Sequence, residues 1–160
     1  MKKFILTAII LCAALTANAQ FYLGGGVRFV NNGNTDVTTF SLAPELGYNL
    51  SDQVALGAAF GISARNTNAG NTNTFSFMPY VRYTFAEIGI ARFFIDGALT
   101  LAKPSNYDGT WEIGVYPGMA LPLNERLSFV AHLGELSYNS GSVFTLGLEN
   151  TVSTGIYYSF

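Results

Sequence analysis

The chain has 160 residues, of which 49% are hydrophobic and only 11% are charged, with a formal net charge of −2. A typical soluble domain carries roughly 25% charged residues, so this composition is too apolar for an ordinary soluble surface. No stretch reaches about 18 consecutive apolar residues, which excludes a membrane-spanning helix. Few and scattered basic residues in an acidic chain argue against nucleic-acid binding. A membrane β-barrel and an unusually apolar soluble β-sandwich remain.

The N-terminal segment predicts a secretion signal. It starts with two lysines, continues with an apolar run and ends with small residues before a cleavage point, which is the pattern of an exported protein. Cleavage would remove Cys12, the only cysteine, so we expect neither a disulfide nor thiol chemistry in the mature domain. The predicted parts are Lys2–Lys3, Phe4–Leu15, the cleavage point between Ala19 and Gln20, a signal peptide over 1–19 and a mature domain over 20–160.

Eight stretches of alternating apolar and polar residues follow, with almost no helix signals. Breaks rich in Asn, Gly, Ser and Asp separate them, and the breaks after the odd-numbered stretches are more polar, which predicts longer loops on one side of the molecule. The segment Thr39–Tyr48 recurs as Thr74–Tyr83, so the repeat unit is one hairpin. The predicted strands are Phe21–Val30, Val37–Asn49, Val54–Arg65, Thr74–Phe85, Arg92–Leu101, Thr110–Leu121, Leu127–Leu136 and Val143–Phe160.

One face of these strands is large and apolar, whereas the other is small or polar. No charged residue falls mid-strand on the apolar face, where a Lys or Arg at the bilayer midplane would cost about 2–4 kcal/mol. A soluble barrel would instead need its polar face to be a charged, solvated surface. The sequence therefore predicts an all-β fold, an eight-stranded antiparallel up-and-down transmembrane β-barrel. The charged residues predicted to face its lumen are Arg28, Glu45, Arg65, Arg82, Asp96, Glu112 and Glu149, and the others fall in connections or at strand ends.

Three prolines run against this pattern. Pro44, Pro79 and Pro117 occupy outward positions on predicted strands. Proline has no backbone N–H to give to a neighbouring strand, so we expect a bulge or broken pairing at each one.

The C-terminal segment Ser153–Phe160 carries a glycine followed by two aromatic residues at fixed spacing, Gly155, Tyr158 and Phe160. This pattern resembles the terminal insertion signal of outer-membrane barrels. Together with the export signal and eight strands, it resembles the outer-membrane protein β-barrel domain family, which includes OmpA-like, OmpX-like and porin-like small barrels. The resemblance implies a bacterial outer-membrane location, contact with outer-membrane lipid, and insertion by the barrel-assembly machinery, which would read Gly155, Tyr158 and Phe160.

The lumen charges suggest two functions. A network of salt bridges would fill a lumen too narrow for an open channel, whereas a gated lumen would make a small porin-like channel. We expect the first, and with it a structural or surface-interaction role; no feature identifies an extracellular partner.

A third alternative is a barrel-embedded lipid-modifying enzyme that uses His132, the only histidine, with Ser128. The spacing of this pair does not favour catalysis, and a single histidine does not favour a metal site. We therefore predict no catalytic residue, no metal site and no cofactor.

Overall fold

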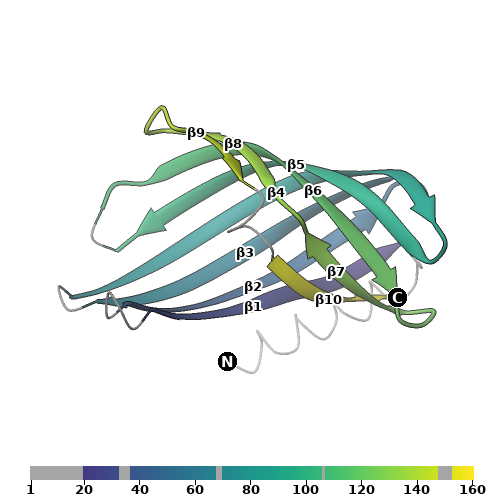
Figure 1. Cartoon of the computed structure of the whole chain (residues 1–160), viewed down its shortest axis with the longest axis horizontal. Coiled ribbons are helices and arrows are strands. Elements are labelled where there is room, and N and C mark those ends of the chain that lie inside the picture. The colour runs from purple at the N-terminus through teal and green to yellow at the C-terminus, as the bar shows by residue number, and fades with distance from the viewer. Residues whose placement is uncertain (1–19, 33–36, 68–69, 106, 148–152) are drawn as a thin grey trace, which may run out of the picture.

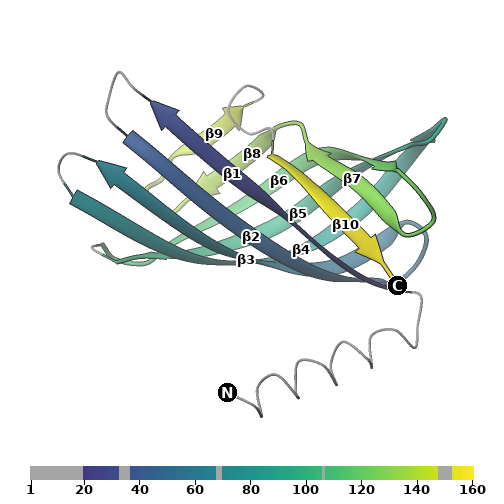
Figure 2. The same ribbon diagram turned by 90° about the horizontal axis from the view of Figure 1, so that it is seen from below.

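The computed structural model describes residues 20–32, 37–67, 70–105, 107–147 and 153–160. These residues form one antiparallel sheet that closes on itself, because β1 pairs with β10 and β5 pairs with β6 (Figures 1 and 2). No helix in the described part of the chain is long and apolar enough to cross a membrane. The strands are β1 Phe21–Asn32, β2 Val37–Asn49, β3 Val54–Thr67, β4 Gly70–Ile88, β5 Ala91–Pro104, β6 Thr110–Pro122, β7 Leu127–His132, β8 Glu135–Asn139, β9 Phe144–Gly147 and β10 Ser153–Ser159.

These ten segments make a barrel wall of eight strands. β7 and β8 lie end to end along β6 and together form the seventh strand of the wall. β9 pairs with β8 and β10 pairs with β7, so these two segments form the eighth. The predicted eight-stranded antiparallel barrel is confirmed. The prediction of a continuous strand over Leu127–Leu136 was wrong, because it is divided into β7 and β8. Within the predicted strand Val143–Phe160, the structure describes β9 and β10, and residues 148–152 lie outside the described residues.

The division of the seventh strand is a bulge opposite Pro117. β6 pairs Gly118 with His132 and Val115 with Leu136, so three steps along β6 match four along the other strand. Pro117 has no N–H to donate, and its carbonyl oxygen instead accepts a hydrogen bond of 2.8 Å from the N–H of Leu133. One extra residue reverses the side to which the following side chains point. Glu135 was predicted to lie in a connection or at a strand end, but because of the bulge its side chain faces the lumen.

Pairing is also interrupted at the other two prolines, as predicted. Between β2 and β3, the ladder is broken between the Leu42 and Glu45 pairs, on either side of Pro44. Between β4 and β5, it is broken between the Phe77 and Tyr80 pairs, on either side of Pro79. In each case the missing pairs are with the next strand in the chain, because the proline has no backbone N–H to donate to it.

The prediction of longer loops on one side was wrong. The β1–β2 ladder continues to the pair Asn32–Val37, and the β3–β4 ladder continues to Thr67–Gly70. The hydroxyl of Thr67 donates a hydrogen bond of 2.9 Å to the carbonyl of Gly70. The Asn- and Thr-rich runs therefore extend the hairpins, because pairing satisfies backbone groups that a loop would leave to water.

The two faces of the wall carry polar and apolar side chains in the opposite arrangement to a soluble globular protein. Large apolar side chains point outward and are exposed, such as Ile113 at 56% and Phe75 at 55%. Glu45 and Asp96 point inward and are buried at 7% and 3% exposure. An apolar exterior around a polar interior is the arrangement of barrels that sit in lipid.

Candidate functional site: a polar cluster that fills the lumen

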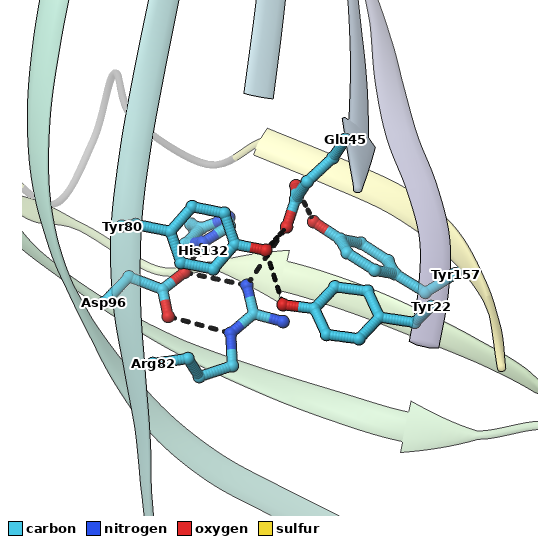
Figure 3. A network of polar contacts seen from close by, with 7 residues as sticks. All are labelled: Tyr22, Glu45, Tyr80, Arg82, Asp96, His132 and Tyr157. Carbon is cyan, nitrogen blue, oxygen red and sulfur yellow. Dashed lines mark hydrogen bonds and ion pairs between the residues drawn. The ribbon is translucent and has the colours of Figure 1, made fainter. Parts of the chain in front are cut away.

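Seven polar side chains meet inside the barrel, in the half nearer the short turns after β2, β4 and β6. We call them the lumen cluster (Figure 3). They come from six segments of the wall and reach across the lumen, from the β1–β10 seam to β4 and β5. The cluster consists of Tyr22, Glu45, Tyr80, Arg82, Asp96, His132 and Tyr157.

Arg82 and Asp96 form the strongest pair of the lumen cluster. The two residues lie directly opposite each other on β4 and β5. Arg82 donates from Nε to Asp96 Oδ1 at 2.8 Å and from Nη2 to Oδ2 at 2.7 Å, the two-pronged geometry in which Arg binds a carboxylate best. His132 Nε2 lies 2.9 Å from Asp96 Oδ2, so three nitrogen atoms from two residues contact this carboxylate.

Glu45 forms the other half of the lumen cluster. Its carboxylate accepts hydrogen bonds from the hydroxyls of Tyr80 and Tyr157, and Tyr80 Oη lies 2.5 Å from Tyr22 Oη. Arg82 Nη2 lies 3.7 Å from Glu45 Oε1. The two carboxylates are thus joined through one guanidinium, and each has hydrogen-bond donors in place of the water it has lost.

Aromatic rings enclose the guanidinium. Its Cζ lies 4.0 Å from the ring centre of Phe94, 5.3 Å from Tyr80 and 5.5 Å from Tyr157. A cation near the face of an aromatic ring is attracted by the ring's electron density, and more strongly where water is excluded. Phe94, the nearest of these rings, is itself 1% exposed, so the guanidinium is shielded from water on that side.

A glycine on a neighbouring strand makes room for each large ring. In each case the ring and the glycine are direct partners in the ladder, and a Cβ on that glycine would collide with the ring. Each ring therefore occupies the space that a side chain on its partner glycine would take. The four pairs are Tyr22 with Gly47, Tyr80 with Gly57, Phe94 with Gly118 and Tyr157 with Gly24.

Below the lumen cluster, toward the short turns, lies a cavity of about 130 Å³. Its walls are mainly polar and include Asn49, Asp52, Arg92 and Ser128, and Arg82 lines it on the side of the lumen cluster. A water molecule takes about 30 Å³ in the liquid, so the cavity has room for a few waters.

Only three of the seven residues predicted for the lumen network belong to this cluster: Glu45, Arg82 and Asp96. Glu112 lies farther toward the other end of the barrel, where it accepts a hydrogen bond of 2.8 Å from Tyr116. Arg65 lies near the end of β3, opposite Thr39 and Thr72, and is exposed. The Arg28 side chain and Glu149 lie outside the described residues.

The residues of the predicted insertion signal lie at the barrel seam. Gly155 packs against the backbone of Gly25, where a Cβ would come within 2.8 Å of the Gly25 oxygen. The ring centres of Tyr158 and Phe160 are 5.0 Å apart, and the N–H of Phe160 donates to Phe21 over 3.1 Å. Of the predicted cleavage residues, Gln20 is described and Ala19 is not.

The geometry does not support catalysis by Ser128 and His132. Both point inward from β7, but four residues of strand separate their backbones by about 13 Å, and a nucleophile and its base must lie within hydrogen-bond reach. The histidine is instead bonded to Asp96, which is already held by Arg82. Within the described ranges, no three His, Cys, Asp or Glu residues are grouped to hold a metal ion.

Sequence reasoning missed the aromatic members of this site. Tyr22, Tyr80, Phe94 and Tyr157 were not among the predicted lumen residues, although Tyr80 shares a predicted face with Arg82. The signal that could have found them is an inward aromatic residue opposite an inward glycine on the next strand. Using that signal requires the register between strands, which the alternation of apolar and polar residues does not fix.

Comparison with solved structures identifies the fold. Neisserial surface protein A is 14% identical, with a TM-score of 0.59 over 89% of this chain and 98% of that one. The Yersinia pestis outer membrane protein Ail is 12% identical, with a TM-score of 0.58 over 89% and 100%. No family model matches the sequence, and no curated protein matches it significantly. The chain has the fold of a small outer-membrane β-barrel. At these identities the similarity extends to the fold alone.

Proposed function

We propose that this chain is an integral protein of a bacterial outer membrane with a structural or surface-interaction role, and that its lumen does not conduct ions. The observation that carries the second part is the lumen cluster. Six of its seven members are buried, among them Glu45, Arg82 and Asp96 at 7%, 9% and 3% exposure, and the side chain of the seventh, His132, is 18% exposed. An eight-stranded barrel is just wide enough inside for side chains to fill it.

The lumen cluster resists opening because its buried charges hold one another in place. An ion that crosses it would have to displace Arg82 from Asp96, and would leave that carboxylate with His132 alone and the guanidinium with only its 3.7 Å contact to Glu45. Removing one partner of a buried ion pair costs about 3–5 kcal/mol. Hydrogen bonds from three tyrosines hold the other side of the cluster in place.

The outward face supports the membrane location. Apolar side chains cover it between two bands of aromatic residues, with Tyr83 and Phe85 near the short turns and Phe75 and Trp111 near the other end. Such bands mark the two interfaces of a membrane barrel. We further propose that the barrel-assembly machinery inserts the chain by reading Gly155, Tyr158 and Phe160.

Conductance across a planar lipid bilayer tests the closed lumen. The folded protein, first shown to have heat-modifiable gel mobility, is expected to give no steady current. The Arg82→Ala variant removes the central cation of the cluster, and Glu112→Ala serves as a control because Glu112 lies outside it. A reproducible open state of the wild type whose conductance changes in Arg82→Ala but not in Glu112→Ala would support the small porin-like channel instead. A protein that fractionates as soluble, with unshifted mobility, would contradict the membrane location.

A further inference from the structure

A groove lies on the outer surface of the barrel at the end away from the short turns, near the start of β4 and β6 and the end of β5. We call it the rim groove. Its volume is about 380 Å³ and its lining is almost entirely apolar. Cross-strand neighbours build it, because Phe75 pairs with Lys103, Phe77 with Leu101, and Leu101 with Trp111. The residues that define it are Phe75, Phe77, Leu101, Lys103, Gly109 and Trp111.

A missing side chain helps to hollow the groove. A Cβ at Gly109 would meet the Ala102 oxygen at 3.6 Å and Lys103 Cδ at 3.8 Å, which are ordinary contact distances. A larger residue would therefore fit at this position and fill the groove. With glycine there, the rings of Phe75 and Trp111 stay 55% and 44% exposed.

The height of the groove matches the boundary between lipid chains and headgroups. Lys103 follows Phe93 on the outward face of β5 by ten residues, or about 33 Å along a strand. With a strand tilt of roughly 40°, this corresponds to about 25 Å of height, the thickness of the apolar band of such barrels. Phe93 lies beside the short turns, so Lys103 lies at the opposite interface, with the apolar groove directly below it.

Lys103 is the only lysine beyond residue 3. Its Nζ donates one hydrogen bond of 3.1 Å to the carbonyl oxygen of Tyr107, and none of the ion pairs found among the described residues includes it. An ammonium group has three N–H donors, so two more are available to an acceptor. The groove is thus an apolar channel with a single positive charge, that of Lys103, at its end farthest from the short turns.

We propose that the rim groove binds a membrane lipid that carries an exposed phosphate. One acyl chain lies along Phe75, Phe77, Leu101 and Trp111, and the phosphate accepts hydrogen bonds from Lys103. The complementarity of charge favours an anionic lipid over a neutral one, and the depth of Lys103 favours a lipid of the leaflet at that end of the barrel. The inference rests on the proposed membrane location.

The chain supplies its own reporter, because Trp111 is the only tryptophan. The folded protein in neutral detergent micelles is titrated with phosphatidic acid that carries bromine atoms on its acyl chains, which quench tryptophan on contact. Brominated phosphatidylcholine has the same chains with a shielded phosphate and is the reference lipid. We expect half-maximal quenching at an approximately fivefold lower mole fraction of phosphatidic acid, as one lysine near an anionic lipid surface provides.

Two variants separate the parts of the site. Lys103→Gln is expected to abolish the preference for phosphatidic acid. Gly109→Leu is expected to weaken quenching by both lipids, whereas Gly97→Leu, on the outward face of β5 with no atom within 4 Å of its Cβ position, is expected to have no effect. Equal quenching by the two lipids in the wild type, an unchanged preference in Lys103→Gln, or unchanged quenching in Gly109→Leu would each overturn the proposal. Heat-modifiable mobility is measured on the wild type and on every variant. A wild type that is not a folded barrel is a failure of the proposed function and not of the groove, and only variants that are folded barrels enter the comparison.

Discussion

Removal of the Arg82 side chain should destabilise the barrel more than removal of any exposed charge. Arg82→Ala deletes the hydrogen bonds of 2.8 and 2.7 Å to Asp96 and leaves that carboxylate, 3% exposed, with His132 alone. Hydrogen bonds to charged groups contribute about 1.5–3 kcal/mol each, so the two together are worth about 3–6 kcal/mol. This agrees with the roughly 3–5 kcal/mol that breaking a buried ion pair costs. We expect the free energy of unfolding to fall by about 3–5 kcal/mol.

The assay is reversible urea unfolding in phospholipid vesicles, followed by the fluorescence of Trp111. Arg92→Ala is a matched control, because Arg92 pairs with Glu87 over 3.1 Å but both side chains are more than half exposed. Such a pair contributes at most about 1 kcal/mol. If Arg82→Ala and Arg92→Ala lowered the free energy of unfolding equally, the lumen cluster would not be what holds the barrel interior together.

Two further predictions concern the wall and its insertion. Gly57→Val places side-chain atoms against the Tyr80 ring and should lower the free energy of unfolding by about 1–3 kcal/mol. The control Gly97→Val faces open space and should change it by about 0.5 kcal/mol or less. Equal effects of the two substitutions in the same urea assay would refute the role of the glycines. Phe160→Ala should reduce the amount of folded barrel in the outer membrane of expressing cells several-fold, as measured by heat-modifiable mobility. Phe85 is an exposed aromatic residue near the same end, and Phe85→Ala should cause no such reduction. An unchanged amount of folded Phe160→Ala protein would argue against a terminal insertion signal.

The periodicity of the sequence was enough to predict the barrel. Alternation depends only on the two faces of a strand, so the first six strands and the outward apolar face could be read directly. The nearness of Arg82 and Asp96 can also be read from the sequence, because both lie a similar distance from one short turn. That turn sets the register between β4 and β5 to within the bulge between Thr84 and Ala86.

The remainder of the site depended on long-range register. Tyr157 contacts Glu45 only because the last strand closes against the first, and no local pattern states how far along it pairs. The bulge after His132 shows the same limit. The alternation of apolar and polar residues through Leu133 and Gly134 does not reveal the extra residue, so a prediction that assumed an unbroken strand placed Glu135 outside the lumen.

The hydrogen bond between Tyr157 and Glu45 has a consequence for the order of folding, because 112 residues separate its partners. Bringing such distant segments together is the slow part of forming a sheet with non-local contacts. Until β10 arrives, the Glu45 carboxylate lacks one of its donors and Gly24 lacks the ring that covers it. Closure of the wall and completion of the lumen cluster are therefore one cooperative event, and the last segment of the chain is the one that locks both.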